Sequence, residues 1–262
     1  MRLILFFLMV LPTFLAAQSA TSLEFPAVDT INQVDKKGRK QGTWKKKHEN
    51  GKTRYIGQFI NDKPSGEFLY YDNYGTLTAK INHLTNDTAE VNFFHDGKNV
   101  MSEGKYYKMQ RTGIWKFYDR EGDITSQCIF VNGKKHGMSR VYYKDGHITK
   151  EEIYENGILN GVVKEFFPSG KIKFTGVYID DNLEGKVEWF HPNGARKVRG
   201  YYKYAVREKT WTHFDSGGSP TLYEYYAKGR LKWSKTPAQV KAEKELKKQK
   251  QDSLNSSPEI KE

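Results

Sequence analysis

A pattern that returns every 24 residues constrains this chain more than any other feature. Residues 137–146 and 161–170 carry the same pattern, in which an opening glycine is followed by a pair of aromatic residues and then by a second glycine. Eight such repeats follow one another at intervals of 24 residues, except for one interval of 23, and they open at Gly42, Gly66, Ala89, Gly113, Gly137, Gly161, Gly185 and Lys209. Self-similarity at a short fixed period is typical of solenoids and other repeat arrays.

Each repeat also contains residues that favour two reversals of the chain. Dipeptides such as Asn50-Gly51 and Asp145-Gly146 accept the positive φ of a tight hairpin turn, and Asn132-Gly133 marks a second reversal of the same kind. Aromatic residues recur five and seventeen positions after the repeat starts, and aromatic residues favour strands. The sequence therefore predicts an all-β fold, an elongated single-layer antiparallel meander of about eight tandem hairpins with a short C-terminal helix.

The N-terminal segment differs from the repeats. Arg2 precedes an apolar run from Leu3 to Leu11, and the small residues Ala16 and Ala17 follow it. This order is typical of a secretory signal, so we expect residues 1–17 to be removed and the protein to be periplasmic, outer-membrane associated or secreted. Residues 18–41 are predicted to form a linker or N-terminal cap, because the end of a repeat array needs a cover.

The composition changes again at the C-terminal end of the predicted repeat array, which spans residues 42–234. Thr236, Pro237 and Gln239 form a favourable helix start, with a capping residue, a proline at the first helical position and a glutamine at the third. We expect a basic, solvated helix over residues 235–250. The polar residues 251–262 are predicted to be disordered.

Two stretches of the repeats resemble a known family. The segment from Cys128 through Phe130, Gly133 and His136 to Gly137, and a second segment at residues 176–185, resemble MORN repeats. The longer period resembles the MORN variant of bacterial proteins, including the YwqK-like antitoxin group. The resemblance implies a hairpin array, and it implies a role as a scaffold, a membrane or phosphoinositide contact module, or an appendage to an enzyme.

Residues that could carry chemistry are scattered. Cys128 is the one cysteine, and its expected role is that of a small, half-buried strand residue. His48, His95 and His191 share one repeat position but belong to distant repeats, so we expect solvated turn residues and no metal cluster. The sequence contains no glycine-rich phosphate loop and no nucleophile elbow. We therefore expect a protein that is not an enzyme and that has no catalytic residues, cofactor or metal.

The charge and the aromatic residues suggest a binding surface. The formal net charge is +12, which suits anionic lipid headgroups or acidic glycans. Basic charge beside aromatic rings is also typical of nucleic-acid binding, but an exported protein rarely meets nucleic acid, and none is expected as a partner. A single-layer sheet cannot cover all of its aromatic rings, and the candidates for an exposed interaction surface are Trp44, Trp115, Trp189 and Trp211.

The leading hypothesis from the sequence is an exported, non-enzymatic repeat protein that binds a protein partner or a component of the cell envelope. The first alternative is an antitoxin or immunity protein, as the family resemblance implies. A second alternative is a module that binds anionic lipid or glycan, and an enzyme acting on carbohydrate is a distant third. An adjacent toxin gene would favour the antitoxin.

Overall fold

The computed structural model describes residues 31–85 and 87–255, in which nineteen strands form one sheet and one helix follows. The first strands are β1 (Gln33–Val34), β2 (Lys40–Lys47), β3 (Thr53–Ile60), β4 (Lys63–Tyr71), β5 (Leu77–His83), β6 (Thr88–Phe94), β7 (Val100–Tyr107), β8 (Gln110–Tyr118), β9 (Ile124–Val131) and β10 (Lys134–Tyr142). The others are β11 (Ile148–Glu155), β12 (Ile158–Leu159), β13 (Gly161–Phe166), β14 (Ile172–Ile179), β15 (Asn182–Phe190), β16 (Arg196–Lys203), β17 (Val206–Phe214), β18 (Pro220–Ala227) and β19 (Arg230–Lys235), followed by α1 (Pro237–Asn255).

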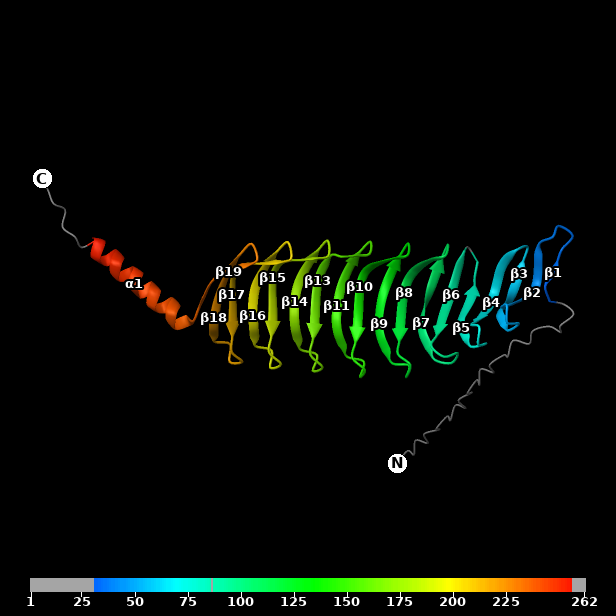
Figure 1. The fold of residues 1–262 in the computed structure, drawn as a ribbon, viewed down its shortest axis with the longest axis horizontal. Helices are drawn as coiled ribbons and strands as arrows, with labels where there is room; N and C mark the ends of the chain where they lie inside the picture. Colours follow the sequence, from blue (N-terminus) through cyan, green and yellow to red (C-terminus); the bar gives the residue numbers. More distant parts are fainter. Residues whose placement is uncertain (1–30, 86, 256–262) are drawn as a thin grey trace, which may run out of the picture.

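The strands lie side by side in chain order along an elongated ribbon, with β1 at one end and α1 projecting from the other (Figure 1). Each strand pairs antiparallel with the next, and β12 and β13 act as one interrupted strand, since both pair with β11. The prediction of a single open meander of hairpins with a C-terminal helix is confirmed. The signal prediction for residues 1–17 lies outside the described residues.

Two kinds of turn connect the strands. In the first turn of seven repeats, a glycine with positive φ donates its N–H three residues back, as from Gly51 to the carbonyl of His48 at 3.0 Å. In the second turn, two consecutive residues have positive φ, and Tyr204 and Ala205 do so without any glycine, at 51° and 58°. Second turns also bond to the preceding repeat, as where the N–H of Ala205 donates to the carbonyl of Leu183, at the start of β15, at 3.2 Å.

Large rings on one face of the sheet lie directly over glycines of the preceding hairpin. A Cβ atom added to Gly104 would lie 2.4 Å from the Trp115 ring, and one added to Gly200 would lie 2.2 Å from Trp211. Where a repeat has no glycine here, the facing residue is small, as Ser139 opposite Cys128. The two fully buried tryptophans therefore both lie over a glycine. Two clusters of buried side chains form around Val91 and Trp115 and around Val187 and Trp211.

The two repeats that open at a residue other than glycine, Ala89 and Lys209, differ in backbone conformation. Lys209 takes a φ of +63°, close to the +65° of Gly113 at the same repeat position, so the eighth repeat keeps the common geometry despite its side chain. Ala89 does not adopt a positive φ, and the register between β5 and β6 runs without the irregularity that the neighbouring strand pairs show. The 23-residue interval therefore removes the extra residue of a β-bulge rather than breaking the sheet.

Both ends of the array differ in detail from the predicted boundaries. The sheet already begins at β1, inside the predicted linker, and the side chain of Asn32 bonds to the N–H of Lys45 at 2.8 Å and to its carbonyl at 3.2 Å. At the other end, the predicted capping box is formed, because Gln239 accepts from the N–H of Thr236 at 2.7 Å. The helix boundaries were wrong, since α1 runs to residue 255, beyond the predicted end at residue 250.

We predict that Gly104→Ala lowers the free energy of unfolding by about 1–3 kcal/mol, because the new methyl group has no space beneath the Trp115 ring. Urea denaturation of the purified protein measures this change. In a Trp115→Val background the same alanine should cost much less, since the smaller side chain leaves room for it. An equal cost in both backgrounds would contradict the proposed contact.

Candidate binding surface

Two of the four tryptophans predicted to form an exposed aromatic surface are buried. Trp115 is 0% and Trp211 is 1% exposed, so the prediction is wrong for both. Each ring is held by the glycine beneath it and by a cation above it, as Arg111 lies 4.4 Å from the centre of the Trp115 ring. Trp44 and Trp189 are half-buried, and Trp189 packs against Trp211 with 5.8 Å between ring centres. These rings therefore stabilise the sheet.

The histidines at the shared repeat position are structural residues and are half-buried rather than solvated. Nε2 of His48, His95 and His191 lies 2.9, 3.0 and 3.1 Å from a backbone carbonyl of the next first turn. The fifth repeat has a tyrosine here, and the Tyr143 hydroxyl donates to the carbonyl of Phe166 at 2.8 Å. Histidine and tyrosine therefore make the same kind of bond at this position. The bond connects the first turns of neighbouring repeats. No group of three or more residues able to hold a metal ion occurs among the described residues.

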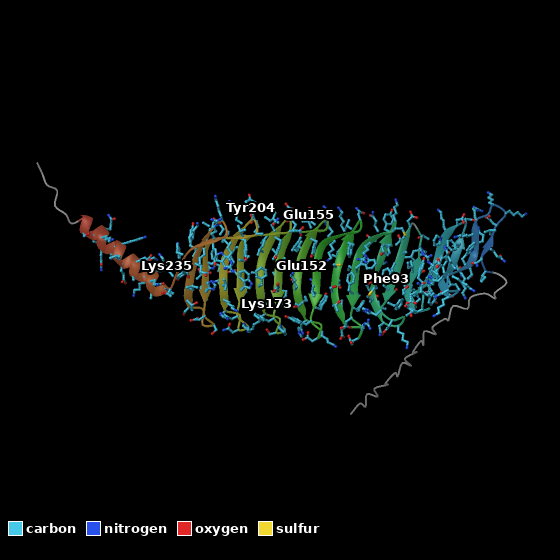
Figure 2. All side chains as sticks on the ribbon, in the orientation of Figure 1. Phe93, Glu152, Glu155, Lys173, Tyr204 and Lys235 are labelled. Carbon is cyan, nitrogen blue, oxygen red and sulfur yellow. The ribbon has the colours of Figure 1, made fainter. Side chains whose placement is uncertain are left out.

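Polar residues interrupt the buried face at the fifth repeat. Ser139 is 5% exposed, and Glu152 lies near the middle of the ribbon with its side chain 12% exposed (Figure 2). Lys150 forms an ion pair with Glu152 at 2.5 Å, and the Tyr154 hydroxyl donates to the same carboxylate at 3.0 Å. Burial, followed by the bond to Glu152, raises the pKa of Tyr154 to about 12. Both oxygens of the carboxylate are engaged in these contacts, and the cluster lies between the two aromatic clusters.

The opposite face of the sheet, called the outer face, has apolar side chains that no other layer covers. Ile114 neighbours the buried Trp115 in the chain and therefore points to the outer face, where it pairs with Ile129. The same pairing joins Met138 to Ile153 and Val162 to Val177. These six residues form the aliphatic band, and they are Ile114, Ile129, Met138, Ile153, Val162 and Val177. Four of them are between 38% and 53% exposed.

The aliphatic band is confined to the central repeats. In the third repeat the ion pair of Glu90 with Lys105 stands at the equivalent place. In the second repeat Glu67 faces Asn82 there and forms an ion pair with Lys80. Towards the C-terminus the band continues into a shallow groove of about 470 Å³ that is lined by Val177, Tyr201 and several charged side chains. This row of the outer face is therefore polar in the second and third repeats and aliphatic over β8–β14, where ion pairs such as that of Arg140 with Glu151 lie beside it. A continuous exposed apolar strip is typical of an interaction surface.

Sequence reasoning missed the aliphatic band, although the chain contains a signal for it. A strand with only one apolar face alternates strictly, whereas the stretches Ile129-Phe130-Val131 and Val162-Val163 place apolar residues on both faces. Consecutive apolar residues of this kind are expected when both faces of a sheet are covered. Here only one face is covered within the described chain, so the apolar residues on the outer face are the finding that needs a functional explanation.

Comparison with protein families places this geometry in a known class. The model of the MORN repeat variant matches five segments of the chain, and each of them covers about two strands of the sheet. The matched segments are residues 40–61, 111–132, 135–156, 159–180 and 183–204. These five segments therefore match MORN repeats of the variant type. Repeats of this family suggest a binding module built from repeated hairpins.

Other comparisons are less informative. The search among curated proteins found no match. Two crystal structures of S. aureus TarM, one of a mutant in complex with fondaparinux, alpha-GlcNAc-glycerol and UDP, are 18% identical to this chain with a TM-score of 0.28. The alignments cover 34% and 37% of this chain but only 18% and 20% of those chains, so the chain spans about a fifth of their length. In the part of the chain that the structure describes, no helix is long and apolar enough to cross a membrane.

We predict that the Cys128 thiol does not react with dithiobisnitrobenzoate at mildly alkaline pH while the protein is folded. The residue is 3% exposed, and burial raises the pKa of its thiol, which disfavours the reactive thiolate. Reaction in concentrated urea supplies the control, because unfolding exposes the thiol. Rapid reaction of the folded protein would show that the sheet opens at the fourth repeat.

Proposed function

We propose that this chain is an exported, non-enzymatic binding module, and that the aliphatic band on its outer face is where a protein partner docks. The band supports the proposal because its apolar side chains are exposed and no other layer of the described chain packs against them. Burial of an aliphatic side chain stabilises an interface by roughly 25 cal/mol per Å² of apolar area. A protein partner supplies the apolar surface that such burial requires.

The geometry of the band favours a partner that contacts several repeats at once. Its residues recur at the 24-residue period, so equivalent side chains lie two strands apart, about 10 Å, along the ribbon. From β8 to β14 the band therefore presents a row about 30 Å long. A partner that follows this row gains contacts from each repeat in turn, while the backbone of the strands stays paired within the sheet. This mode of binding needs no strand exchange and no change in the array.

The remaining polar groups on the described strands support a binding role rather than catalysis. Glu188 is held by three cations, with Arg196 at 2.8 Å and Lys186 at 2.9 Å. Glu224 accepts from His213 at 3.0 Å and from Tyr226 at 3.3 Å. Because these carboxylates are engaged in structural bonds, they stabilise the sheet and leave the apolar surface as the feature available to a partner.

The band is tested by replacing Ile114 and Val162 together by serine. We expect this variant to fold and to lose the partner, because it removes two exposed apolar side chains from the centre of the band. The measurement is photocrosslinking in the native host from a probe at Met138, followed by mass spectrometry. Capture should fall at least tenfold, which corresponds to about 1.4 kcal/mol of binding free energy.

The matched control replaces Ile60 and Leu231 by serine, since both are exposed, at 57% and 50%, and lie outside the band. This control should retain full capture of the same protein. Equal capture by the band variant and the control would contradict the proposal. Capture of a toxin encoded beside this chain would identify the partner and would favour the antitoxin role.

Export makes a separate prediction about the N-terminus of the mature protein. If residues 1–17 form a cleaved signal, the protein purified from its native host should begin at Gln18. N-terminal sequencing and intact mass measure this directly. A mature chain that still begins at Met1 and remains in the cytoplasmic fraction would contradict export, while leaving the binding role of the band untouched.

A further inference from the structure

Three shallow grooves lie on the outer face, and they differ in the charge of their walls. The groove beside Tyr201 has Glu184 and Glu208 as well as lysines in its walls. A second groove contains Glu90 and Glu103 beside their ion-pair partners Lys105 and Lys116. The third, of about 640 Å³, lies on the first hairpin and has no carboxylate among its lining residues. Its lining residues are Lys45, Lys47, Gly51, Lys52, Thr53, Ile56, Tyr71, Tyr74 and Gly75.

This first-hairpin groove lies in the most strongly charged part of the molecule. Residues 35–54 contain nine lysines and arginines against two acids, which gives a net charge of +7 out of +12 for the whole chain. None of Lys45, Lys47 and Lys52 forms an ion pair with a carboxylate of the described residues. The nearby Asp72 is already used, because its carboxylate accepts from the N–H groups of Tyr74 and Thr76. Asp72 keeps its negative charge but does not line the groove, so the lining itself is cationic.

The structure places two of the lysines on one strand and fixes the third beside them. Lys45 and Lys47 are two residues apart on β2, on the same face of the sheet, so their side chains start roughly 7 Å apart along the strand. Lys52 follows the turn and is fixed by a bond from its Nζ to the carbonyl of Tyr74 at 2.8 Å. The exposed ring of Tyr74 forms one wall. An extended peptide places every second side chain on one side at the same spacing of roughly 7 Å.

We propose that the first-hairpin groove binds an extended acidic peptide segment, in which aspartate or glutamate occupies alternate positions. The carboxylates pair with Lys45, Lys47 and Lys52, and the backbone of the segment lies over Ile56 and beside Tyr74. This inference rests on the proposed function, since the segment belongs to the protein partner, and it adds a second contact at the polar end of the outer face. Charge complementarity of this kind speeds association and selects the partner.

A synthetic peptide that alternates Glu and Ser over about ten residues, enough to span β2 and its turn, tests the proposal. Fluorescence anisotropy with the mature full-length protein should show saturable binding that weakens as salt rises from about 50 to about 200 mM. Replacing Lys45, Lys47 and Lys52 by glutamine should weaken binding roughly tenfold, since it removes three exposed ion pairs, each of which contributes modestly to affinity. Circular dichroism shows whether this variant keeps its sheet.

Three controls make the result specific. Replacing Lys241, Lys244 and Lys247 of α1 by glutamine removes the same charge elsewhere and should leave binding unchanged. A peptide with its glutamates in one block should bind more weakly, because neighbouring side chains of an extended chain point to opposite sides. The Ile114→Ser/Val162→Ser variant should bind the alternating peptide normally, so that failure of the aliphatic band and failure of this groove can be told apart.

Several outcomes would overturn the proposal. These are no binding of the alternating peptide, equal affinity for the two peptides, and equal loss in the two lysine variants. The last measurement is binding of the protein to vesicles of phosphatidylserine and phosphatidylcholine in equal parts. If the protein binds these vesicles through Lys45, Lys47 and Lys52 and does not bind the peptide, the ligand of the groove is an anionic lipid surface and the peptide assignment is wrong.

Discussion

The contact between a large ring and a glycine of the preceding hairpin is the interaction on which this structure depends. A single hairpin is marginally stable in water, so each one must bury apolar surface against its neighbours. In a sheet of one layer, a large ring is buried most completely when it lies flat on the backbone beside it, which requires that the residue beneath has no side chain. Trp115 over Gly104 and Trp211 over Gly200 meet this requirement and are fully buried. Repeats without such a glycine use small facing residues, such as Ser139.

This way of forming a core leaves the outer face free for other roles. Because the rings are buried by backbone and by their neighbours on one face, the described chain does not need the opposite face for stability. The sequence of the outer face changes along the ribbon, from the basic first hairpin, through ion pairs in the second and third repeats, to the aliphatic band of β8–β14. Figure 2 shows side chains along the whole length of the ribbon and on its edges, where Tyr204 and Glu155 lie. A constant scaffold thus presents three different surfaces in a fixed order.

The sequence predicts the hairpin array well because turns and period are local properties. Asn132-Gly133 requires only its own two residues to form a turn, and both take positive φ. Burial of Trp115 could not be predicted in this way, because it depends on Gly104 of another hairpin and on the register that joins them. The positive φ of Lys209 likewise follows from its place in the repeat rather than from its own propensity. The aliphatic band could be found only after the two faces were known.

The contact between ring and glycine is tested most directly by the proton chemical shifts of the glycines in solution. A hydrogen held against the face of an indole ring is shielded by the ring current. Nuclear magnetic resonance of the folded protein should therefore show Hα resonances of Gly104 and Gly200 far upfield of those of turn glycines such as Gly122, around which no side chain lies. Ordinary shifts for Gly104 and Gly200 would contradict the account, because the rings would then not lie on the backbone of the preceding hairpin.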